Sequence, residues 1–514
     1  MFSSMHTGGI TGLEAYPVRV EVDISRGLPG FELVGSLGGE VKEAKERVQI
    51  ALKNAGISLP VSKITVNLSP ANIRKEGTGY DLAIAAGLLS CMGVVEADSL
   101  RTTAFLGELA LDGAIGRVNG VLPIALALKN EGIQYLVVPI DNVGEGAEIP
   151  GISLIGVRNM AEFLMYLQAG EEERKNIFKD RRGIKNKQEK QEGKNRLDFA
   201  DVYGQESAKR AAEVAAAGFH HLLLAGPPGA GKTMIASRIP SILPPLTKQE
   251  RIEVASIYSI AGKLAGKEGL PAERPFVAPH HTISPQALAG GGRLPRPGML
   301  SFSHRGVLFM DEMPEFSSDA LEVLRQPMED KVVRVIRSRG SCTYPADFML
   351  VGAMNPCPCG YYPDKNRCSC SETEIRRYLG RISGPILDRI DMVAEVSAVQ
   401  LKELHQKEKG ESSAAVRKRV MEARKRQKLR FKGTPYQFNG ELPGREVERY
   451  CTLSSEERHF LERVFEAGQM SLRAYHKVIK LARTIADLEG EVHIKKTHLS
   501  EAVCYNGGRE QFWS

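Results

Sequence analysis

The sequence predicts a multidomain α/β protein in which two α/β domains precede a helical domain, and three observations support this fold class. The chain has 514 residues, which is too long for one compact core, since domains commonly hold about 100–200 residues. Strand-like and helix-like patterns alternate up to about residue 396, and only helical patterns follow. A content of 42% hydrophobic and 25% charged residues is typical of a globular protein and disfavours the disordered and membrane classes.

Residues 1–170 are predicted to form the first α/β domain. The longest apolar stretch, Leu82 to Val95, is shorter than the roughly 20 residues that span a bilayer, so we expect a buried helix there. The N-terminal sequence MFSSMHTGG lacks the basic start and apolar segment of a secretion signal, and we therefore expect a cytoplasmic protein. The expected strands cover 18–24, 63–68 and 135–139, and the expected helices cover 41–54, 82–91 and 122–131.

Residues 171–196 are predicted to be a linker. The segment EEERKNIFKDRRGIKNKQEKQEGKNR is dense in charge and nearly free of apolar residues, so it cannot bury enough surface to hold a fold. From 197 to 396 the succession of strand, glycine turn and helix resumes, which predicts a second α/β domain with a parallel sheet. Its apolar strand runs lie at 221–225, 307–310 and 348–353.

Residues 397–514 contain helical patterns without a convincing strand, and we expect them to form a helical lid. The most regular of these patterns cover 416–430, 454–467 and 472–489. The formal net charge of +7 permits a polyanionic partner, but an excess this small in a long chain decides little.

The segment HLLLAGPPGAGKTMIASRI has the pattern of a phosphate-binding loop, G-x-x-x-x-G-K-[ST], between an apolar strand and a helix. Glycines let backbone N–H groups curl round phosphates, Lys232 can reach the β and γ phosphates, and the hydroxyl of Thr233 can bind Mg²⁺. The alternative is a glycine-rich loop that matches the pattern by chance. The apolar strand before the loop and the helix after it argue against this alternative. The residues predicted to bind ATP are Gly226, Pro227, Pro228, Gly229, Ala230, Gly231, Lys232, Thr233 and Met234.

The run GVLFMDE places two acids at the end of a buried strand. Asp311 is expected to hold Mg²⁺, and Glu312 to orient or deprotonate the water that attacks the γ-phosphate. The alternative is that Glu312 is only a carboxylate at a helix N-terminus. A phosphate loop followed by this acid pair predicts hydrolysis of ATP.

Three further polar residues follow the acids along the chain. FMLVGAMN is an apolar strand that ends at Asn355, at the sheet edge where α/β proteins place ligands, and we expect Asn355 to sense the γ-phosphate. SGPILDRID contains Arg389 between two acids, and MSLRAYHKVIKLARTIADLEG contains Arg473 near the start of an amphipathic helix. Either arginine alone could equally be one half of a surface ion pair.

In this order, the phosphate loop, the Asp-Glu strand, the Asn-ended strand, LDRID and S-x-R resemble AAA+ ATPases of the magnesium-chelatase-like branch. Segments such as RPGMLSFSHRGVLFMDEMPEF, AMNPCPCG and ARTIADLEG extend the resemblance to the YifB/ComM family over nearly the whole chain. The resemblance implies that Arg389 is a finger completing a neighbouring subunit's site and that Arg473 is a lid arginine contacting the nucleotide. It also implies a ring, expected to be a hexamer, in which an arginine supplied in trans contributes about 10³ or more to the rate.

Four of the eight cysteines fall in one short segment, NPCPCGYYPDKNRCSC. Two close pairs could supply a tetrahedral Cys₄ site for a structural Zn²⁺ that holds a segment of almost no apolar content. The alternatives are reduced thiols or a redox pair, because the C-x-C spacing is tighter than the common C-x₂-C. The four candidate ligands are Cys357, Cys359, Cys368 and Cys370.

The segments FLGELALDG, GRVNGVLPIALALKNEGI and YLVVPIDN of the first domain resemble the S5-type proteolytic domain of Lon proteases. The family's catalytic residues do not carry over. EGTGYD puts Gly79 and Tyr80 near the position expected for the nucleophilic serine, and Pro123 lies near the position expected for the lysine. The resemblance therefore implies a proteolytically inactive domain, used as a scaffold or docking tier.

The segment DKVVRVIRSRGSCTYPAD alternates polar and apolar residues around a turn and predicts a β-hairpin. In the family that the chain resembles, this insertion points into the central channel, where arginines could hold the phosphates of DNA. A second candidate channel loop is PHHTISPQALAGGGRLPRPG, in which the role of His280 and His281 stays open. The candidate DNA-binding residues are Arg334, Arg337, Arg339, Arg293 and Arg296, with ordinary solvated arginines as the alternative.

A third basic stretch, RKRVMEARKRQKLRFKG, has helical periodicity and could bind nucleic acid, although a charged lid face or a subunit contact is the preferred interpretation. Together with the resemblance, the hairpin arginines predict a hexameric motor that migrates branched DNA in recombination or natural transformation. The alternative is an ATPase that remodels a protein client, like the magnesium-chelatase motor subunit. An ATP-dependent protease is disfavoured by Gly79 and Tyr80.

Overall fold

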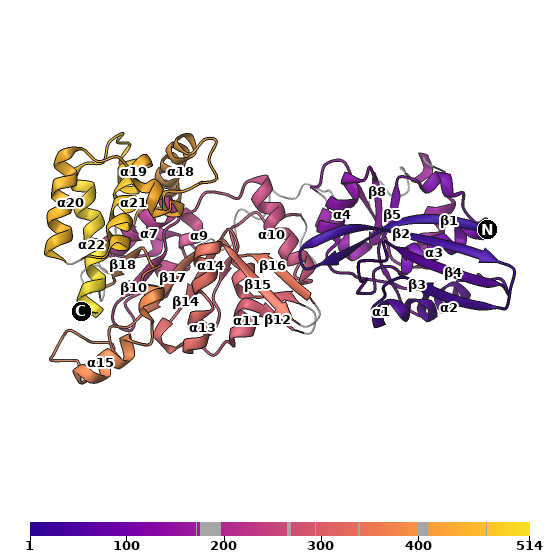
Figure 1. The fold of residues 1–514 in the computed structure, drawn as a ribbon, viewed down its shortest axis with the longest axis horizontal. Coiled ribbons are helices and arrows are strands. Elements are labelled where there is room, and N and C mark those ends of the chain that lie inside the picture. Colours follow the sequence, from indigo (N-terminus) through magenta and orange to yellow (C-terminus); the bar gives the residue numbers. More distant parts are fainter. Residues whose placement is uncertain are drawn as a thin grey trace. The chain divides into compact units, whose positions relative to one another are not determined.

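The computed structural model describes residues 1–146, 148–170, 172–174, 197–264, 269–292, 295–337, 340–397, 410–468 and 470–513. Most of the predicted linker 171–196 lies outside them. The chain divides into two compact units, Met1–Gln191 with Lys248–Pro271, and Glu192–Thr247 with Ala272–Ser514. Figure 1 shows mixed α/β structure followed by helices towards the C-terminus, as the sequence predicts.

A mixed sheet forms the centre of the first unit, with the strand order β3-β4-β2-β1-β5-β8-β9 in its described part. The pairs β1–β2 and β2–β4 are antiparallel and the other pairs are parallel. Val18, Val20 and Val22 alternate with more exposed residues along β2, so one face of this strand is buried. The strands are β1 (Phe2–Thr11), β2 (Glu14–Ser25), β3 (Gly30–Val34), β4 (Lys63–Ser69), β5 (Thr103–Phe105), β8 (Tyr135–Pro139) and β9 (Ser153–Val157).

The helices of the first unit pack against this sheet. The apolar stretch that begins at Leu82 forms most of α3, which is buried along nearly its whole length, as predicted. Among the described residues, no helix combines the length and the hydropathy needed to cross a membrane. The remaining elements are α1 (Gly39–Lys42), α2 (Ala44–Asn54), α3 (Asp81–Cys91), η1 (Ala97–Leu100), β6 (Glu108–Leu109), β7 (Ile115–Gly116), α4 (Val121–Asn130), η2 (Ile140–Gly146) and α5 (Met160–Gln168).

Helix α10 (Lys248–Ile260) belongs to the first unit, although it lies far along the chain. The hydroxyl of Ser259 donates to Glu145 Oε2 at 2.5 Å, and the Gly120 amide donates to the Ser259 carbonyl at 3.1 Å. The guanidinium of Arg251 donates to Glu148 at 2.8 Å. The range 197–396 was predicted as one continuous domain, but its segment 248–271 packs with the N-terminal sheet's helices instead.

The second unit is built on a parallel sheet with the order β11-β14-β17-β10-β18 in its described part. Helices lie on both faces of a sheet of this kind, which explains why β10, β14 and β17 are buried throughout and read as continuous apolar runs. The strands are β10 (Leu222–Ala225), β11 (Phe276–Val277), β14 (Val307–Met310), β17 (Met349–Met354) and β18 (Met392–Glu395).

Short helices and two hairpins surround the parallel sheet. The hairpins are β12 (Gly290–Gly291) with β13 (Arg296–Pro297), and β15 (Val332–Arg337) with β16 (Gly340–Pro345). The second of these is the hairpin predicted between residues 330 and 347. The other elements are η4 (Phe199–Asp201), α7 (Glu206–Gly218), α8 (Lys232–Ala236), α9 (Ile239–Ile242), α11 (Pro285–Ala289), α12 (Met299–Phe302), η5 (Met313–Glu315), α13 (Ser318–Glu322), α14 (Arg325–Asp330), α15 (Glu372–Leu379) and α16 (Gly384–Leu387).

The described residues from 410 onwards are helical and contain no strand, as predicted for this region. Helix α21 begins after Ser471, whose side chain accepts a hydrogen bond from the Ala474 amide, and ends at Gly490, which has a φ of 83°. The elements are α18 (Ser413–Arg430), η6 (Asn439–Glu441), α19 (Gly444–Tyr450), α20 (Ser455–Ala467), α21 (Leu472–Glu489) and α22 (Lys496–Trp513).

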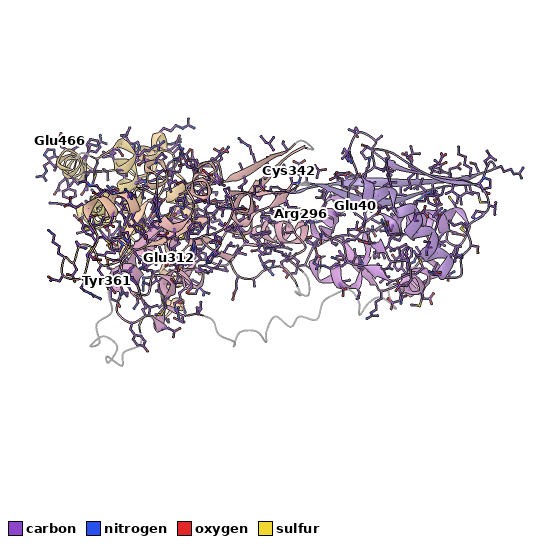
Figure 2. The ribbon with its side chains drawn as sticks, turned by 90° about the horizontal axis from the view of Figure 1, so that it is seen from below. Glu40, Arg296, Glu312, Cys342, Tyr361 and Glu466 are labelled. Atoms are coloured by element: carbon purple, nitrogen blue, oxygen red, sulfur yellow. The ribbon has the colours of Figure 1, made fainter. Side chains whose placement is uncertain are left out.

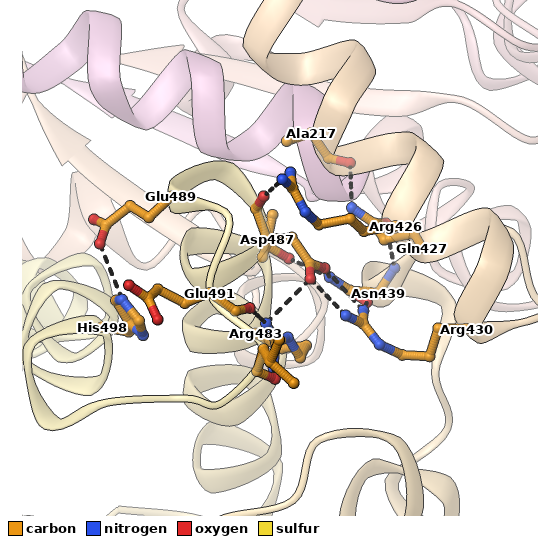
Figure 3. Close-up of polar contacts among 12 residues, drawn as sticks. Ala217, Arg426, Gln427, Arg430, Asn439, Arg483, Asp487, Glu489, Glu491 and His498 are labelled. Atoms are coloured by element: carbon orange, nitrogen blue, oxygen red, sulfur yellow. Dashed lines mark hydrogen bonds and ion pairs between the residues drawn. The ribbon is translucent and has the colours of Figure 1, made fainter.

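A buried polar network joins these helices to one another and to α7 (Figure 3). Asp487 of α21 is fully buried and accepts hydrogen bonds from Arg430 at 2.8 Å and from Asn439 at 2.9 Å. Gln427 of α18 donates to the carbonyl of Ala217 in α7 at 3.0 Å. Because a buried carboxylate is costly without partners, these contacts explain how Asp487 lies in the interior.

Candidate nucleotide site and its surroundings

The predicted phosphate loop connects β10 to α8. Gly229 and Gly231 have φ values of 75° and 92°, in the left-handed region where residues with a Cβ are strained. A Cβ on Gly226 would lie 2.1 Å from the carbonyl oxygen of Val396. The loop thus needs glycine at each of these three positions, for two different reasons.

Lys232 holds the loop in a closed turn. Its Nζ donates to the carbonyl oxygens of Gly226 at 2.7 Å and Pro227 at 2.9 Å, and to Asn355 Oδ1 at 2.9 Å. Burial lowers the pKa of Lys232, and the carboxylates of Asp311 and Glu312 partly offset that effect. The predicted γ-phosphate sensor and the predicted phosphate-binding lysine are therefore in direct contact.

The order of the strands brings the polar residues together. Strand β17 lies between β10 and β14, so Asn355, which follows β17, lies between the phosphate loop and the acids that follow β14. The hydroxyl of Thr233 donates to Asp311 Oδ2 at 2.7 Å. The two predicted Mg²⁺ ligands thus adjoin each other, and oxygen donors of this kind are those that Mg²⁺ prefers.

Glu312 occupies an unusual backbone position. Its φ is 50°, and its amide donates to Asp311 Oδ1 at 3.0 Å. Its side chain is 58% exposed, so it can reach a water molecule in front of the sheet edge (Figure 2). Nδ1 of His281 lies 4.0 Å from Glu312 Oε2.

The contact of His281 with Glu312 was not predicted. Both His280 and His281 follow β11, a neighbour of β14 in the sheet, and their ring centroids lie 4.1 Å apart. Nδ1 of His280 is 2.9 Å from the hydroxyl of Thr282. The order of the sheet was the missing information, because β11 is adjacent to β14 only in the fold.

The two predicted catalytic arginines lie together, away from the phosphate loop. Arg389 and Arg473 both line a cavity of about 410 Å³ to which no residue of the loop contributes. Arg389 Nη2 lies 2.6 Å from Glu329 Oε1, and Arg473 Nη1 lies 3.8 Å from Asp388 Oδ2. Arg473 was expected to be a lid arginine that contacts the nucleotide, and in this chain it lines the same cavity as Arg389.

Two lysines of α21 donate hydrogen bonds to segments beside this cavity, and one of these segments carries Arg389. Lys477 Nζ donates to the carbonyl of Ile390 at 2.5 Å, and Lys480 Nζ donates to the carbonyl of Gly440 at 3.0 Å. Both lysines line the same cavity as Arg389 and Arg473. This side of the second unit therefore gathers cations from the lid and from the segment before β18.

The four cysteines of the predicted metal site come together. Their sulfur atoms all lie within 4.8 Å of one another. The Sγ of Cys357 is 3.3 Å from that of Cys359 and 3.8 Å from that of Cys368. A tetrahedron with Zn–S bonds of about 2.3 Å has edges of about 3.8 Å. The donor set and its spacing therefore fit a four-coordinate Zn²⁺ ion.

Comparisons with known proteins give the family. The family model for magnesium chelatase, subunit ChlI, matches residues 198–404. Models for subunit ChlI of Mg-chelatase and for the subunit ChlI C-terminal region match residues 20–142 and 410–506.

Competence protein ComM of Haemophilus influenzae is 40% identical over 495 residues, covering 96% of this chain and 95% of that protein. The uncharacterized protein YifB of Salmonella typhimurium is 42% identical over 503 residues, covering 98% and 96%. The chain belongs to the YifB/ComM family of magnesium-chelatase-like proteins.

As a YifB/ComM protein, the chain is an ATPase of this family's type, with a parallel sheet that fits an AAA+ core. Part of the chain is also similar to a protein of another kind. Lon protease 2 of Bacillus subtilis is 30% identical over 169 residues, which cover 31% of this chain and 30% of that protein.

Two of the residues expected near the Lon-type catalytic positions, Tyr80 and Pro123, are buried in this chain. Tyr80 is 2% exposed, and a Cβ on Gly79 would lie 2.8 Å from Leu106. The next residue, Asp81, is fully buried and accepts hydrogen bonds from Arg47 at 2.7 and 3.0 Å. Burial raises the pKa of Asp81 to about 6, against the opposing effect of Arg47.

Pro123, at the position expected for the lysine, is buried within α4. Pro123 carries no ionisable group, and the hydroxyl of Tyr80 is buried.

Two of the basic residues predicted for DNA, Arg334 and Arg296, lie on the two hairpins. Arg334 is 57% exposed and lies 3.9 Å from Asp330. Arg296 is exposed on β13. The side chain of Arg337 and the whole of Arg339 and Arg293 lie outside the described residues. The hairpins lie side by side (Figures 1 and 2), because the hydroxyl of Tyr344 on β16 donates to the carbonyl of Pro295 at 2.7 Å.

The third basic stretch forms α18, and its arginines contact the protein itself. Arg419 lies 2.5 Å from Glu213, and Arg424 stacks over the ring of Phe438. Arg417 donates to the carbonyl of Ser241 at 2.7 Å, and Arg426 and Arg430 both bond to Asp487. These contacts favour a structural role for this helix over binding of nucleic acid.

Proposed function

We propose that this chain is the subunit of a hexameric AAA+ motor that couples ATP hydrolysis to movement along DNA, migrating branched intermediates of recombination or natural transformation. The observation that carries the proposal is the pair of adjacent hairpins with exposed arginines, Arg296 and Arg334, in a chain that is 40% identical to a competence protein. Such a motor acts in the cytoplasm.

ATP would bind over the phosphate loop. Its β and γ phosphates replace the loop carbonyls as partners of Lys232, which already has its three donors arranged in one turn. Thr233 and Asp311 would hold Mg²⁺, which would neutralise charge on the phosphates. Glu312 then orients the attacking water, and Asn355 contacts the γ-phosphate. Release of that phosphate returns Lys232 to the carbonyls.

The motor is a ring because the site is divided between neighbours. Arg389 and Arg473 of one subunit reach the triphosphate held by the next, where their charge stabilises the transferring phosphoryl group. In the single chain each arginine is held by an acid instead, Glu329 and Asp388. Both ion pairs must open when the neighbour's phosphates arrive, so assembly and hydrolysis are coupled.

The four cysteines hold a structural Zn²⁺ in this proposal. All four ligands come from the protein, so no coordination position is left for water and the metal has no direct part in hydrolysis.

The N-terminal domain, with its Lon-like resemblance and buried Tyr80, serves as a docking tier in the proposed ring. The domains stay as proposed at 1–170, 171–196, 197–396 and 397–514, except that α10 is shared with the first.

DNA passes along the two hairpins in this proposal. The candidates are Arg334, Arg337 and Arg339 on one hairpin and Arg293 and Arg296 on the other. Their guanidinium groups would contact phosphates, so affinity must fall steeply with salt.

The test is ATP-dependent unwinding of four-way, forked and linear DNA by wild type and Glu312→Gln. Loss of unwinding in the variant, with DNA binding kept, is expected. Equal activity in both proteins would contradict the proposal.

A second candidate is an ATPase that remodels a protein client, favoured by the three magnesium chelatase models that match the chain. Stimulation of ATP hydrolysis by DNA alone separates the two, since a protein remodeller gains nothing from DNA. The matched control is Arg334→Glu, which keeps the hairpin but reverses one exposed charge. A stimulation unchanged in this variant would favour the protein client.

A further inference from the structure

The cysteine segment lies directly on the phosphate loop. Cys357 follows Asn355 by two residues, and Asn355 accepts the hydrogen bond from Lys232 at 2.9 Å. Gly360, with a φ of 86°, faces Pro228 so closely that a Cβ there would lie 2.3 Å from the Pro228 Cδ. The segment therefore touches the nucleotide site at two points, through a hydrogen bond and through van der Waals contact.

The sulfur atoms are arranged as metal ligands are. Besides the short Sγ–Sγ distances, the amides of Gly360 and Tyr362 donate to the Cys357 sulfur at 3.2 and 3.4 Å. Backbone N–H groups that point at a sulfur stabilise it as a thiolate, the form that binds Zn²⁺. Cys357 is fully buried, so its sulfur is shielded from water on the side of the phosphate loop.

Little else holds the segment in place. Residues 361–370 are exposed or only partly buried. Among these residues, Arg367 stacks on Tyr361, with the guanidinium 4.1 Å from the ring centroid. Beyond the cysteines, α15 begins with Ser371 and Glu374 capping each other. A cross-link among the cysteines would thus fix the path between the end of β17 and the start of α15 (Figure 1).

We propose that Zn²⁺ bound by Cys357, Cys359, Cys368 and Cys370 clamps the nucleotide site, so that ATP binding by each subunit depends on the metal. The clamp acts by holding Gly360 against Pro228 and Asn355 against Lys232. This inference rests on the proposed ATP site and extends the structural role of the metal to control of that site. A metal-free subunit keeps its fold but loses the geometry of its phosphate loop.

The size of the effect follows from the contacts. A displacement of about 1 Å at Asn355 breaks its hydrogen bond with Lys232, and a bond to a charged group corresponds to a loss of about ten- to hundredfold in affinity. The ion pairs of Arg389 and Arg473 involve other segments and should be unaffected. The clamp therefore affects nucleotide binding first, and hydrolysis as a consequence.

The experiment compares full-length wild type with Cys368→Ser and with the matched control Cys504→Ser, an exposed cysteine outside the cluster. Zinc content is measured by elemental analysis, affinity by titration with a fluorescent ATP analogue, and folding by thermal melting. We expect about one zinc per wild-type chain, loss of zinc with at least tenfold weaker nucleotide binding in Cys368→Ser, and no change in Cys504→Ser.

A second variant, Gly360→Ala, separates the metal from the clamp. It keeps all four cysteines but adds a methyl group against Pro228 at a position of positive φ. We expect zinc to be retained and nucleotide affinity to fall.

Three results would overturn the inference. If the wild-type protein contains no zinc, the proposed metal site is wrong. If a zinc-free, folded Cys368→Ser binds nucleotide with unchanged affinity, nucleotide binding does not depend on the metal. Wild type that binds zinc but no ATP removes the proposed nucleotide site, and the clamp with it.

Discussion

The phosphate-loop cluster and the arginine cavity belong to the same unit, but only the first is complete within one chain. Lys232 has three acceptors from its own chain, and Thr233 is bonded to Asp311. Arg473 is 61% exposed beside one acid, and the buried Nε of Arg389 has no hydrogen-bond partner among the described residues. The difference is the one expected under the proposed ring, in which one chain binds the nucleotide and its neighbour supplies Arg389 for hydrolysis.

The largest effect is expected for Arg389→Ala. Hydrolysis should fall about 10³-fold because the transferring phosphoryl group loses the charge supplied by the neighbour. Binding of a fluorescent ATP analogue should stay unchanged, since Arg389 does not touch the phosphate loop of its own chain. Release of phosphate and binding of the analogue are measured on the same preparation.

The control for Arg389→Ala is to mix its subunits with subunits of a second inactive variant, Lys232→Ala. A Lys232→Ala subunit cannot hold ATP but still offers Arg389, so mixed rings of the two inactive variants should regain part of the activity. If rings that contain both subunits, shown by tagged co-purification, stay inactive, the assignment of Arg389 to the neighbour's site is wrong.

The next largest effect is expected for Glu312→Gln, at about 10² in the rate of hydrolysis. The amide keeps the size of the side chain but can no longer accept a proton from water. Nucleotide should remain bound, and single-turnover measurements should show that the chemical step is slowed. A variant that hydrolyses ATP at the wild-type rate would leave Glu312 without a catalytic role.

A smaller loss, about tenfold, is expected for Arg473→Ala, because one interaction with a charged group is removed while Arg389 remains. Leu472→Ala is the matched control, since Leu472 is the adjacent and equally exposed residue of α21. Steady-state hydrolysis at saturating ATP is the measurement. An equal loss in both variants would indicate disturbance of α21 rather than loss of a charge.

Much of the phosphate-loop cluster could be predicted from the sequence. Lys232 and Thr233 lie in one contiguous motif, and Asp311 and Asn355 each end an apolar strand of a parallel sheet. Carboxyl ends of parallel strands share an edge, so these residues had to meet.

Contacts between distant elements could not be predicted in this way. The pairing of His281 with Glu312 depends on the strand order, and the position of Arg473 depends on how α21 packs. The packing of α10 within the first unit includes the hydrogen bond from Ser259 to Glu145, which is 114 positions away in the sequence. The sequence placed the segment of α10 in the domain 197–396, because a helix shows an apolar face without showing what covers it.

The smallest effect concerns pH and again separates the two sites, because His221 lines the arginine cavity and no residue of the phosphate loop does. Burial lowers the pKa of His221 from 6.5 to about 4, and burial also lowers that of His220. Between these values the unfolded chain binds protons that the folded chain does not, so the free energy of unfolding should fall as the pH drops from about 6.5 to about 4.

The fluorescence of Trp513, the single tryptophan, reports on the second unit through its contact with Leu379. His221→Asn keeps an acceptor for the Leu350 amide but removes the titration, so its stability should vary less over this range. An identical pH profile in both proteins would show that His221 is not the group that titrates.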